Sequence, residues 1–524
     1  MNKKKQTILL FFLFSFSAYC AIIIGKSWDE GFAFRQGKST LDYLFSLGRI
    51  DEYFWGREYY SGIYWSLQYL LTTTLPLKYQ IETGHLVNLI FSLATIVGVG
   101  QLGKEFFNKK VGKIIFLILF FYPIFFGHMS FNPKDMFLAF GHVWIFYSIL
   151  RYLKKQNIRD KANKYIILIG LLAAASTGIQ LVFLGSFITV FLFILVDILL
   201  VKKFVKYDFN KKLFLFDLSK SFIIFYFILT LFWTDAHSNI LTSQFNFFME
   251  NLSGDHWRGW PFNLINGKYY FSQNVPKFYI FINLLFKSPE YFLVCYLIFP
   301  FIALNSKNYF KKKIKFFNYK LFLIISVLLL PNLILFFIPF PVYDGMRLFL
   351  WSVPYFCIIP ALTIYFLLEN FKKNVIKVLI GIIFPLVFYF LFNFLSFTPY
   401  QYSYLNIFNG KTVNGFKKFE NDYWGGSLKE LIKKSDFLNE NRTLAFCGVN
   451  HAVVKYYLTK YNFSKVKIVN SNEDFDFIVM TNRTQLDDVS SEKNKIKTCF
   501  DKYQGNDLSS VKRNGLVLST IREK

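Results

Sequence analysis

Apolar runs of about 20 residues recur along this chain, and they constrain its fold more than any other feature. Such a run forms a helix long enough to cross a hydrocarbon core of roughly 30 Å. The 524 residues also include 69 Phe and 33 Tyr, more large rings than a soluble domain of this size buries without exposing apolar patches. The sequence therefore predicts a polytopic α-helical membrane protein.

Lysine-rich loops between the runs predict the topology. Basic clusters fall in every second loop, as the positive-inside rule requires, at residues 3–5, 104–113, 151–164, 202–220, 307–320 and 372–377. We therefore interpret the net charge of +27 as a mark of the cytosolic side and its anionic lipids, and not as a nucleic-acid-binding surface. We expect about eleven spans, with the N-terminus in the cytosol and the C-terminus outside, at residues 7–25, 82–103, 112–128, 136–152, 164–181, 183–201, 219–235, 290–306, 319–340, 347–369 and 375–397.

Two domains are expected. Residues 1–398 form the transmembrane domain, in which residues 26–81 are a first external loop with aromatic-rich helices lying in the interface. Hydropathy falls after Pro399, and residues 399–524 are predicted to be a small external α/β domain. Its expected helix is 451–461, and its expected strands are 444–446, 466–469, 475–480 and 515–521.

Two cysteines, Cys447 and Cys499, lie in this polar C-terminal region. If the region is exported, an oxidising compartment allows a disulfide between them. The alternative is that both are unpaired thiols of the domain core. The sequence leaves both readings open.

The adjacent carboxylates Asp29 and Glu30 follow the first apolar run on the predicted external face. An interfacial carboxylate that is partly desolvated by Trp28 has the setting of a catalytic base. The alternative is that both carboxylates end a helix and keep its terminus in water.

Two further polar turns fall on the same predicted face. In Asn132-Pro133-Lys134-Asp135, the lysine suits a phosphate and Asp135 suits either catalysis or a helix N-terminus. In Tyr343-Asp344-Gly345-Met346-Arg347, the arginine suits a lipid phosphate or a headgroup.

Three other groups carry weaker signals. Lys287 stands before an apolar run and has the same two readings as Arg347. His128 suits a proton carrier, a metal ligand or an ordinary hydrogen-bonded histidine, and Asp255 and His256 lack the spacing of a metal site.

Together these motifs resemble the GT-C class, the membrane glycosyltransferases that use polyprenyl-phosphate sugars. Within it the chain is similar to bacterial relatives of protein O-mannosyltransferases and of the aminoarabinose transferase of lipid A. The similarity covers residues 1 to 430 and is carried by Trp28-Asp29-Glu30-Gly31, Phe131-Asn132-Pro133-Lys134-Asp135, Lys287-Ser288-Pro289, Tyr343-Asp344-Gly345-Met346-Arg347, residues 399–406 and residues 419–427.

The resemblance implies inverting transfer from a polyprenyl-phosphate sugar to a hydroxyl acceptor at the external face of a bacterial inner membrane. Asp29 is then the base, with Glu30 as its partner and Asp135 as a second essential acid. The residues assigned to substrate binding are Lys134, Arg347, Tyr343, Asp344, Arg35 and Lys287.

One departure from the family pattern is Arg347-Leu348, because relatives often have Arg-His at this place. No cofactor is implied with certainty, and a divalent metal stays open. Neither the donor sugar nor the acceptor is indicated.

Two other functions fit a polytopic chain. A secondary transporter places ionisable residues near the bilayer midplane and often has repeated halves, whereas these acids cluster at one interface and no repeat is visible. A glycan ligase of cell-envelope biosynthesis shares the external site but takes a diphosphate-linked donor.

Overall fold

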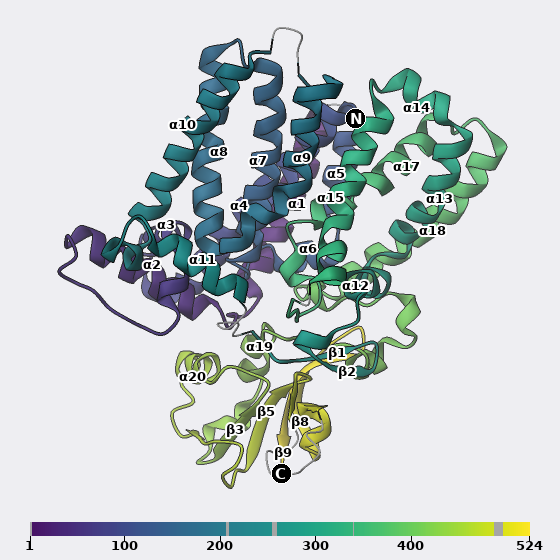
Figure 1. Ribbon diagram of the computed structural model, residues 1–524. Coiled ribbons are helices and arrows are strands. Elements are labelled where there is room, and N and C mark those ends of the chain that lie inside the picture. The colour runs from purple at the N-terminus through teal and green to yellow at the C-terminus, as the bar shows by residue number, and fades with distance from the viewer. Residues whose placement is uncertain (1–2, 206–208, 254–258, 339, 487–495) are drawn as a thin grey trace.

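The computed structural model describes residues 3–205, 209–253, 259–338, 340–486 and 496–524. A large block of helices forms one part, and a small β-sheet with short helices lies against one end of it (Figure 1). The N-terminus lies at the end of the block far from the sheet, and the chain ends within the sheet (Figure 1).

Helices make up most of the chain. The first half contains α1 Lys3–Ile23, α2 Glu30–Phe45, α3 Ile63–Thr72, α4 Gln80–Phe106, α5 Lys109–Phe120, α6 Pro123–His128, α7 Asp135–Lys155, α8 Arg159–Ile179, α9 Ile188–Val196, α10 Lys211–Leu231 and α11 Ser243–Ser253. The second half contains α12 Tyr279–Lys287, α13 Glu290–Asn305, α14 Lys307–Lys313, α15 Phe317–Phe337, α16 Val353–Phe356, α17 Ile358–Glu369, α18 Asn374–Ser396, α19 Leu428–Lys433, α20 His451–Lys460 and α21 Cys499–Lys502.

Eight helical segments of the described residues are long and apolar enough to cross a membrane. Each corresponds to one of the predicted spans, and they are Lys4–Ile23, Leu77–Phe106, Asp135–Lys155, Arg159–Ile179, Leu181–Val201, Lys211–Leu231, Phe317–Phe337 and Asn374–Ser396. The prediction of a mostly helical membrane fold with a small C-terminal sheet is therefore confirmed, while the count of eleven is not.

The other three predicted spans are not single straight helices of spanning length. Residues 112–128 divide into α5 and α6 at Pro123. In residues 347–369 the apolar helix begins only at Val353, with Pro354 in its first turn, and Val353–Glu369 is shorter than the eight candidate spans. The span expected at 290–306 is α13, which meets α12 at an angle of 118° around Pro289. Proline disfavours helical geometry in the residue before it, so an apolar run that contains proline need not be one straight helix.

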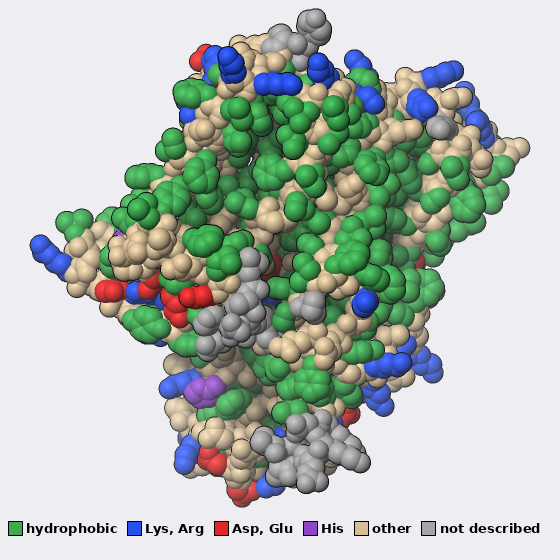
Figure 2. All heavy atoms as spheres, viewed as in Figure 1, with side chains coloured by type: hydrophobic (Ala, Val, Ile, Leu, Met, Phe, Trp, Pro, Cys, Tyr) green, Lys and Arg blue, Asp and Glu red, His purple; other side chains and the backbone are tan. Residues whose placement is uncertain are grey.

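The ends of the helical block differ in charge. Lys and Arg gather at the upper end in Figure 2, and hydrophobic side chains cover the middle of this face. Ion pairs join helix ends at the basic end: Glu369 pairs with Lys110 and Lys313, at 2.5 and 2.8 Å, and Lys154 pairs with Glu105 at 2.9 Å. The helices α2, α3 and α11 lie at the opposite end, nearer the sheet (Figure 1).

The C-terminal sheet has five strands in the order β4-β3-β5-β9-β8. Strand β3 runs parallel to β4 and β5, whereas β9 is antiparallel to β5 and β8. The four expected strands and the expected helix (α20) are present, and β8 was not predicted. The strands of the described chain are β1 Phe262–Ile265, β2 Lys268–Phe271, β3 Thr443–Cys447, β4 Lys467–Ile468, β5 Phe477–Thr481, β6 Thr484–Leu486, β7 Ile496–Thr498, β8 Asn506–Arg513 and β9 Leu516–Glu523.

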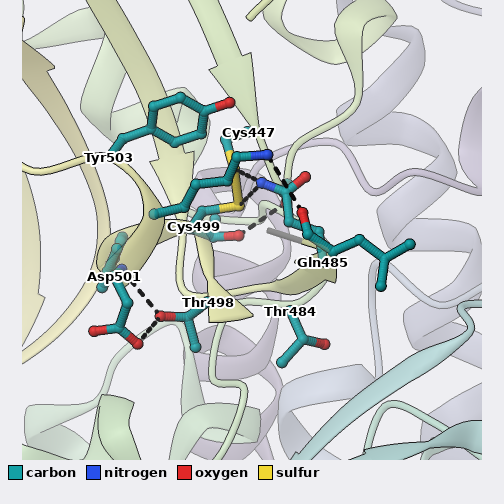
Figure 3. The surroundings of a disulfide bond; sticks show 12 residues. Cys447, Thr484, Gln485, Thr498, Cys499, Asp501 and Tyr503 are labelled. Carbon is teal, nitrogen blue, oxygen red and sulfur yellow. Dashed lines mark hydrogen bonds between the residues drawn. A yellow bond between two sulfur atoms is a disulfide. The ribbon is translucent and has the colours of Figure 1, made fainter. Parts of the chain in front are cut away.

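Cys447 and Cys499 form a disulfide, with their Cα atoms 5.8 Å apart (Figure 3). The bond joins the end of β3 to the start of α21, two positions that are 52 residues apart in the sequence. Of the two readings left open by the sequence, the disulfide is the correct one.

The segment between the last long helix and the sheet packs closely on the helical block. Gly25 N, after α1, donates to Gly426 O at 2.9 Å. A Cβ at Gly127 would lie 2.2 Å from the backbone nitrogen of Tyr402, so only glycine fits there. These contacts fix the connecting segment against α1 and α6.

Candidate active site

Arg347 is the centre of a buried charge cluster between the helical block and the sheet. Its guanidinium donates to three carboxylates: from Nη2 to Asp29 Oδ2 at 3.0 Å, from Nε to Asp135 Oδ2 at 2.9 Å and from Nη1 to Asp344 Oδ2 at 2.8 Å. It also lies 4.2 Å from the ring centre of Trp424. Arginine suits this position because its planar fork presents several donors in fixed directions. The Arg347 guanidinium thus brings together four segments that are far apart in the sequence, those of Asp29, Asp135, Asp344 to Arg347 and Trp424.

Asp29 is the accessible acid of the cluster. It is the N-cap residue of α2, where a carboxylate interacts favourably with the helix dipole. Its side chain is 39% exposed, against 3% for Asp135 and 0% for Asp344. Asp29 is therefore the carboxylate that an incoming molecule reaches first.

Glu30 has different surroundings although it is the next residue. Its carboxylate is fully buried, accepts a hydrogen bond from Ser27 N at 2.6 Å and lies 2.9 Å from Nε2 of His85 in α4. His85 Nδ1 in turn contacts the carbonyl oxygen of Ala21 at 2.8 Å. These contacts join the start of α2 to α1 and α4.

Asp135 and Lys134 are presented by the turn before α7. Asn132 fixes this turn, because its Oδ1 accepts from Asp135 N at 2.9 Å and its Nδ2 donates to Asp135 Oδ2 at 3.0 Å. Lys134 Nζ donates to the hydroxyl of Tyr60 at 3.1 Å and makes no ion pair with a described carboxylate.

Asp344 lies in a strained turn. It has a φ of +58° and is followed by Gly345 with a φ of +62°, the left-handed region that ordinary residues rarely adopt. A Cβ on Gly345 would lie 2.9 Å from Lys287 Nζ, so this glycine lets the lysine approach the turn. The adjacent ring of Tyr343 lies 5.4 Å from the Arg347 guanidinium.

Lys287, at the end of α12, is a second cation in this region without an ion pair to a described carboxylate. Its side chain is buried, and Nζ lies 4.8 Å from the ring centre of Phe419. Buried lysines are costly unless an anion compensates them. Lys287 is thus compensated only through space, by Glu420 and Asp344, and Lys134 likewise has Asp135 nearby.

Arg483, which the sequence analysis did not single out, comes from the sheet. Its Nη1 donates to Asp344 Oδ1 at 2.8 Å and to the carbonyl oxygen of Tyr423 at 2.8 Å. One arginine in a polar turn carries no pattern that separates it from a surface residue, so the sequence offered no signal for this role.

The segment 419–427 closes the site from the side of the sheet. Tyr423 OH lies 2.7 Å from Nε2 of His128, which stacks on Phe131. This contact agrees with the interpretation of His128 as an ordinary hydrogen-bonded histidine. Asp422 accepts from Gly426 N and Ser427 N at 2.8 and 2.9 Å, and burial raises the pKa of its carboxyl.

Glu420 is a second buried carboxyl of this segment whose pKa is raised. Burial raises its pKa to about 7, Asp344 acts in the same direction and Arg483 opposes them. Thr484 donates to its Oε1 from both N and Oγ1, at 2.8 Å each.

Several buried polar atoms around the cluster have no hydrogen-bond partner among the described residues. They are Asp135 Oδ1, Trp28 Nε1 and Arg483 Nε. Buried polar groups are nearly always paired, and unpaired atoms also occur elsewhere in the described chain, for example at Ser148 and Asn332.

Arg35 is placed apart from the cluster, where it pairs with Glu52 at 2.9 Å and lies over the ring of Phe54. In the described part of the chain, no group of three or more His, Cys, Asp or Glu side chains is arranged to hold a metal ion. Asp255 and His256 lie outside the described residues.

Comparison with solved structures identifies the fold. ArnT from Cupriavidus metallidurans in the apo state aligns with a TM-score of 0.52 and 11% identity, over 99% of this chain and 98% of that one. The same protein bound to undecaprenyl phosphate aligns with a TM-score of 0.53 and 10% identity over the same shares. The Archaeoglobus fulgidus oligosaccharyltransferase AglB, in complex with an inhibitory peptide and a dolichol-phosphate, aligns with a TM-score of 0.40 and 10% identity, over 92% of this chain and 70% of that one.

No family model and no curated protein sequence matches the chain. The structural agreement extends over almost the whole of both chains, so this protein has the fold of ArnT. The fold implied by the resemblance to GT-C enzymes is thereby confirmed.

Proposed function

We propose that the protein is an integral membrane glycosyltransferase that moves a sugar from a polyprenyl-phosphate donor to a hydroxyl acceptor. The observation that carries this proposal is the binding of one buried arginine, Arg347, to three carboxylates, of which only Asp29 is substantially exposed. This arrangement places a base and a phosphate-binding cation side by side. The ArnT structure with bound undecaprenyl phosphate supports a donor of this class.

The reaction we propose is an inverting displacement. Asp29 accepts the proton of the acceptor hydroxyl while the hydroxyl oxygen attacks the anomeric carbon. The bond from that carbon to the phosphate oxygen breaks, and polyprenyl phosphate leaves with the electron pair. Asp135 and Asp344 hold the Arg347 guanidinium in position throughout.

The charge of the site supports a phosphate ligand. Asp29, Asp135 and Asp344 contribute three carboxylates, and four cations surround them: Arg347, Arg483, Lys134 and Lys287. In a setting shielded from water, such preorganised donors stabilise the charge that develops on a leaving phosphate. We assign Lys134, Lys287 and Arg347 to the phosphate and Tyr343 to the wall of its pocket.

We further propose that the site faces the outside of a bacterial inner membrane. The basic loops lie at one end of the helical block and the sheet at the other (Figures 1 and 2), and positive loops mark the cytosol. The disulfide of the sheet also fits an oxidising compartment. The division of the chain at residue 399 into a membrane domain and an external domain belongs to this proposal.

The experiment is mass spectrometry of the lipids that co-purify with the full-length protein from its native membrane. A bound polyprenyl phosphate or polyprenyl-phosphate sugar is the expected result, and the sugar would name the donor. A diphosphate-linked glycan would instead indicate a ligase. Absence of such lipids, together with substrate uptake into vesicles that contain the protein, would indicate a transporter and overturn the proposal.

A further inference from the structure

A buried arginine of the C-terminal sheet, Arg483, reaches into the site of the helical block. It lies in the turn between β5 and β6, and only 2% of its side chain is exposed. Its Nη1 contacts Asp344 Oδ1, while Arg347 contacts the other oxygen of the same carboxylate. Asp344 is therefore shared by two guanidinium groups, one from each part of the molecule.

Aromatic rings fix the guanidinium of Arg483. Its central carbon lies 5.0 Å from the ring centre of Trp28 and 4.4 Å from that of Trp260, and the two rings meet edge to face at 5.6 Å. Such contacts strengthen when the cation is desolvated. Trp28 directly precedes Asp29, so the arginine also contacts the segment that carries the exposed acid.

The backbone of the turn is held by several bonds. Cys499 N donates to Arg483 O at 2.9 Å, and Cys499 is covalently joined to Cys447 (Figure 3). On the other side, Asn482 Nδ2 donates to the carbonyl oxygens of Phe416 and Phe419 at 2.9 and 2.7 Å. The turn is therefore anchored both to the sheet and to the segment that closes the site.

We propose that Arg483 is a positioning residue for the donor phosphate, acting through Asp344 on Arg347. The inference rests on the proposed function and adds to it a role for the sheet. With Arg483 present, each oxygen of Asp344 pairs with a different arginine, so Arg347 is not the only cation that neutralises this carboxylate. Without Arg483, Arg347 would be the only cation in ion-pair contact with the buried Asp344 carboxylate, and less of the Arg347 charge would act on a phosphate.

The test is a titration of the full-length protein with undecaprenyl phosphate, followed by native mass spectrometry and by the fluorescence of the site tryptophans. We expect Arg483→Gln to lose at least tenfold in affinity. Arg483→Lys should lose less, because lysine keeps the charge but cannot contact Asp344 and Tyr423 in the same geometry.

The matched control is Arg522→Gln. Arg522 lies on β9 of the same sheet, where it donates to Asp507 at 2.6 Å and to the carbonyl oxygens of Phe500 and Tyr503. It should bind the lipid like the wild type. Measuring the melting temperature of each variant, and binding well below it, separates lost positioning from lost folding.

Two results would overturn the inference, and they are distinguishable. Wild-type affinity in Arg483→Gln, with binding by the wild-type protein intact, would overturn the role of Arg483 alone. Failure of the wild-type protein to bind undecaprenyl phosphate would overturn the proposed donor and this inference with it. If Arg483→Gln does not fold, wild-type affinity in Arg483→Lys would overturn the role.

Discussion

Arg347 Nη2 and Asp29 Oδ2 lie 3.0 Å apart although 318 residues separate them in the sequence. The contact joins the turn after α15 to the turn after α1. It brings the most exposed acid of the cluster next to its most highly coordinated cation. The proposed function assigns Asp29 as the base and Arg347 to the phosphate, and this contact places the two side by side.

Replacing Asp29 by Asn should abolish transfer without weakening lipid binding. A positioned general base contributes on the order of 10²–10⁴-fold to a rate, so we expect kcat to fall by at least about 100-fold. Undecaprenyl phosphate should bind at least as well, because a negative charge near the phosphate is removed. The assay is sugar transfer from the donor lipid identified by mass spectrometry.

The control for this variant is Asp42→Asn on the same helix, where Asp42 pairs with the exposed Lys38 at 2.6 Å. It should keep wild-type activity. Unchanged transfer in Asp29→Asn would refute the assignment of the base.

Replacing Arg347 by Gln should damage both stability and binding. Removal of one partner from a buried ion pair typically costs about 3–5 kcal/mol, and here three carboxylates lose the same cation. Arg347→Lys keeps the charge, but one ammonium cannot bridge all three acids, so it should fold better and still bind undecaprenyl phosphate at least tenfold more weakly.

Thermal unfolding and native mass spectrometry measure these two effects. Arg513→Lys is the control, since Arg513 pairs with Glu430 away from the cluster at 2.5 Å. Lipid affinity in Arg347→Lys equal to that of the control would contradict a phosphate role.

Much of the fold follows from local pattern. The long apolar runs without an interrupting turn became the eight candidate spans, and the alternating segments after residue 440 became the strands. What the pattern missed depends on single backbone positions. Pro123 begins α6 and Pro289 separates α12 from α13, whereas Pro300, Pro331 and Pro385 are accommodated inside helices, so the presence of a proline does not by itself predict a break.

The site was predictable in part. Asp29, Asp135 and Arg347 were grouped because all three fall on one predicted face, and the structure brings them into contact. Glu30 was grouped with Asp29 because the two are adjacent and because the resemblance implies a partner role for it. Successive side chains on a helix point about 100° apart, so neighbours in sequence need not share an environment. Arg483 was missed because its burial arises from tertiary contacts.

Replacing Glu30 by Gln should lower stability more than activity. Glutamine still accepts from Ser27 N but loses the negative charge facing His85. We expect a cost of about 1–3 kcal/mol, with kcat of the folded protein within about threefold of wild type because Asp29 retains its contact with Arg347. Thermal unfolding and the transfer assay measure the two quantities.

His85→Gln provides the matched variant. Because the two side chains form one contact, the double variant should be little less stable than either single one. A loss of kcat as large as that of Asp29→Asn would instead place Glu30 in the chemistry.

Removal of the disulfide should destabilise the sheet. Closing a loop of 52 residues restricts the unfolded chain by about 4 kcal/mol in the loop-entropy estimate. The Cys447→Ala/Cys499→Ala variant should therefore melt lower and be cut more readily by protease. Dithiothreitol should lower the melting temperature of the wild type and leave the variant unchanged. Equal sensitivity of both proteins to dithiothreitol would show that the bond does not stabilise the sheet.

Glu420 should make stability depend on pH. Its pKa in the folded protein is about 7, raised by burial from an ordinary value of 4.5. The folded state therefore holds its proton more tightly than the unfolded state. Its contribution is complete below about pH 4.5, is lost as the pH rises through 7, and amounts to about 3 kcal/mol.

Replacing Glu420 by Gln should remove this dependence. Glutamine keeps an acceptor for the two hydrogen bonds from Thr484 and carries no charge near Asp344 and Arg483. The measurement is the melting temperature between pH 5 and 8, taken as the difference between variant and wild type so that other titrating groups cancel. The melting temperature of the variant relative to that of the wild type should increase as the pH rises, whereas that of Glu473→Gln, at an exposed site, should not change. Parallel curves for Glu420→Gln and wild type would mean that Glu420 already carries its charge in the folded protein at pH 5.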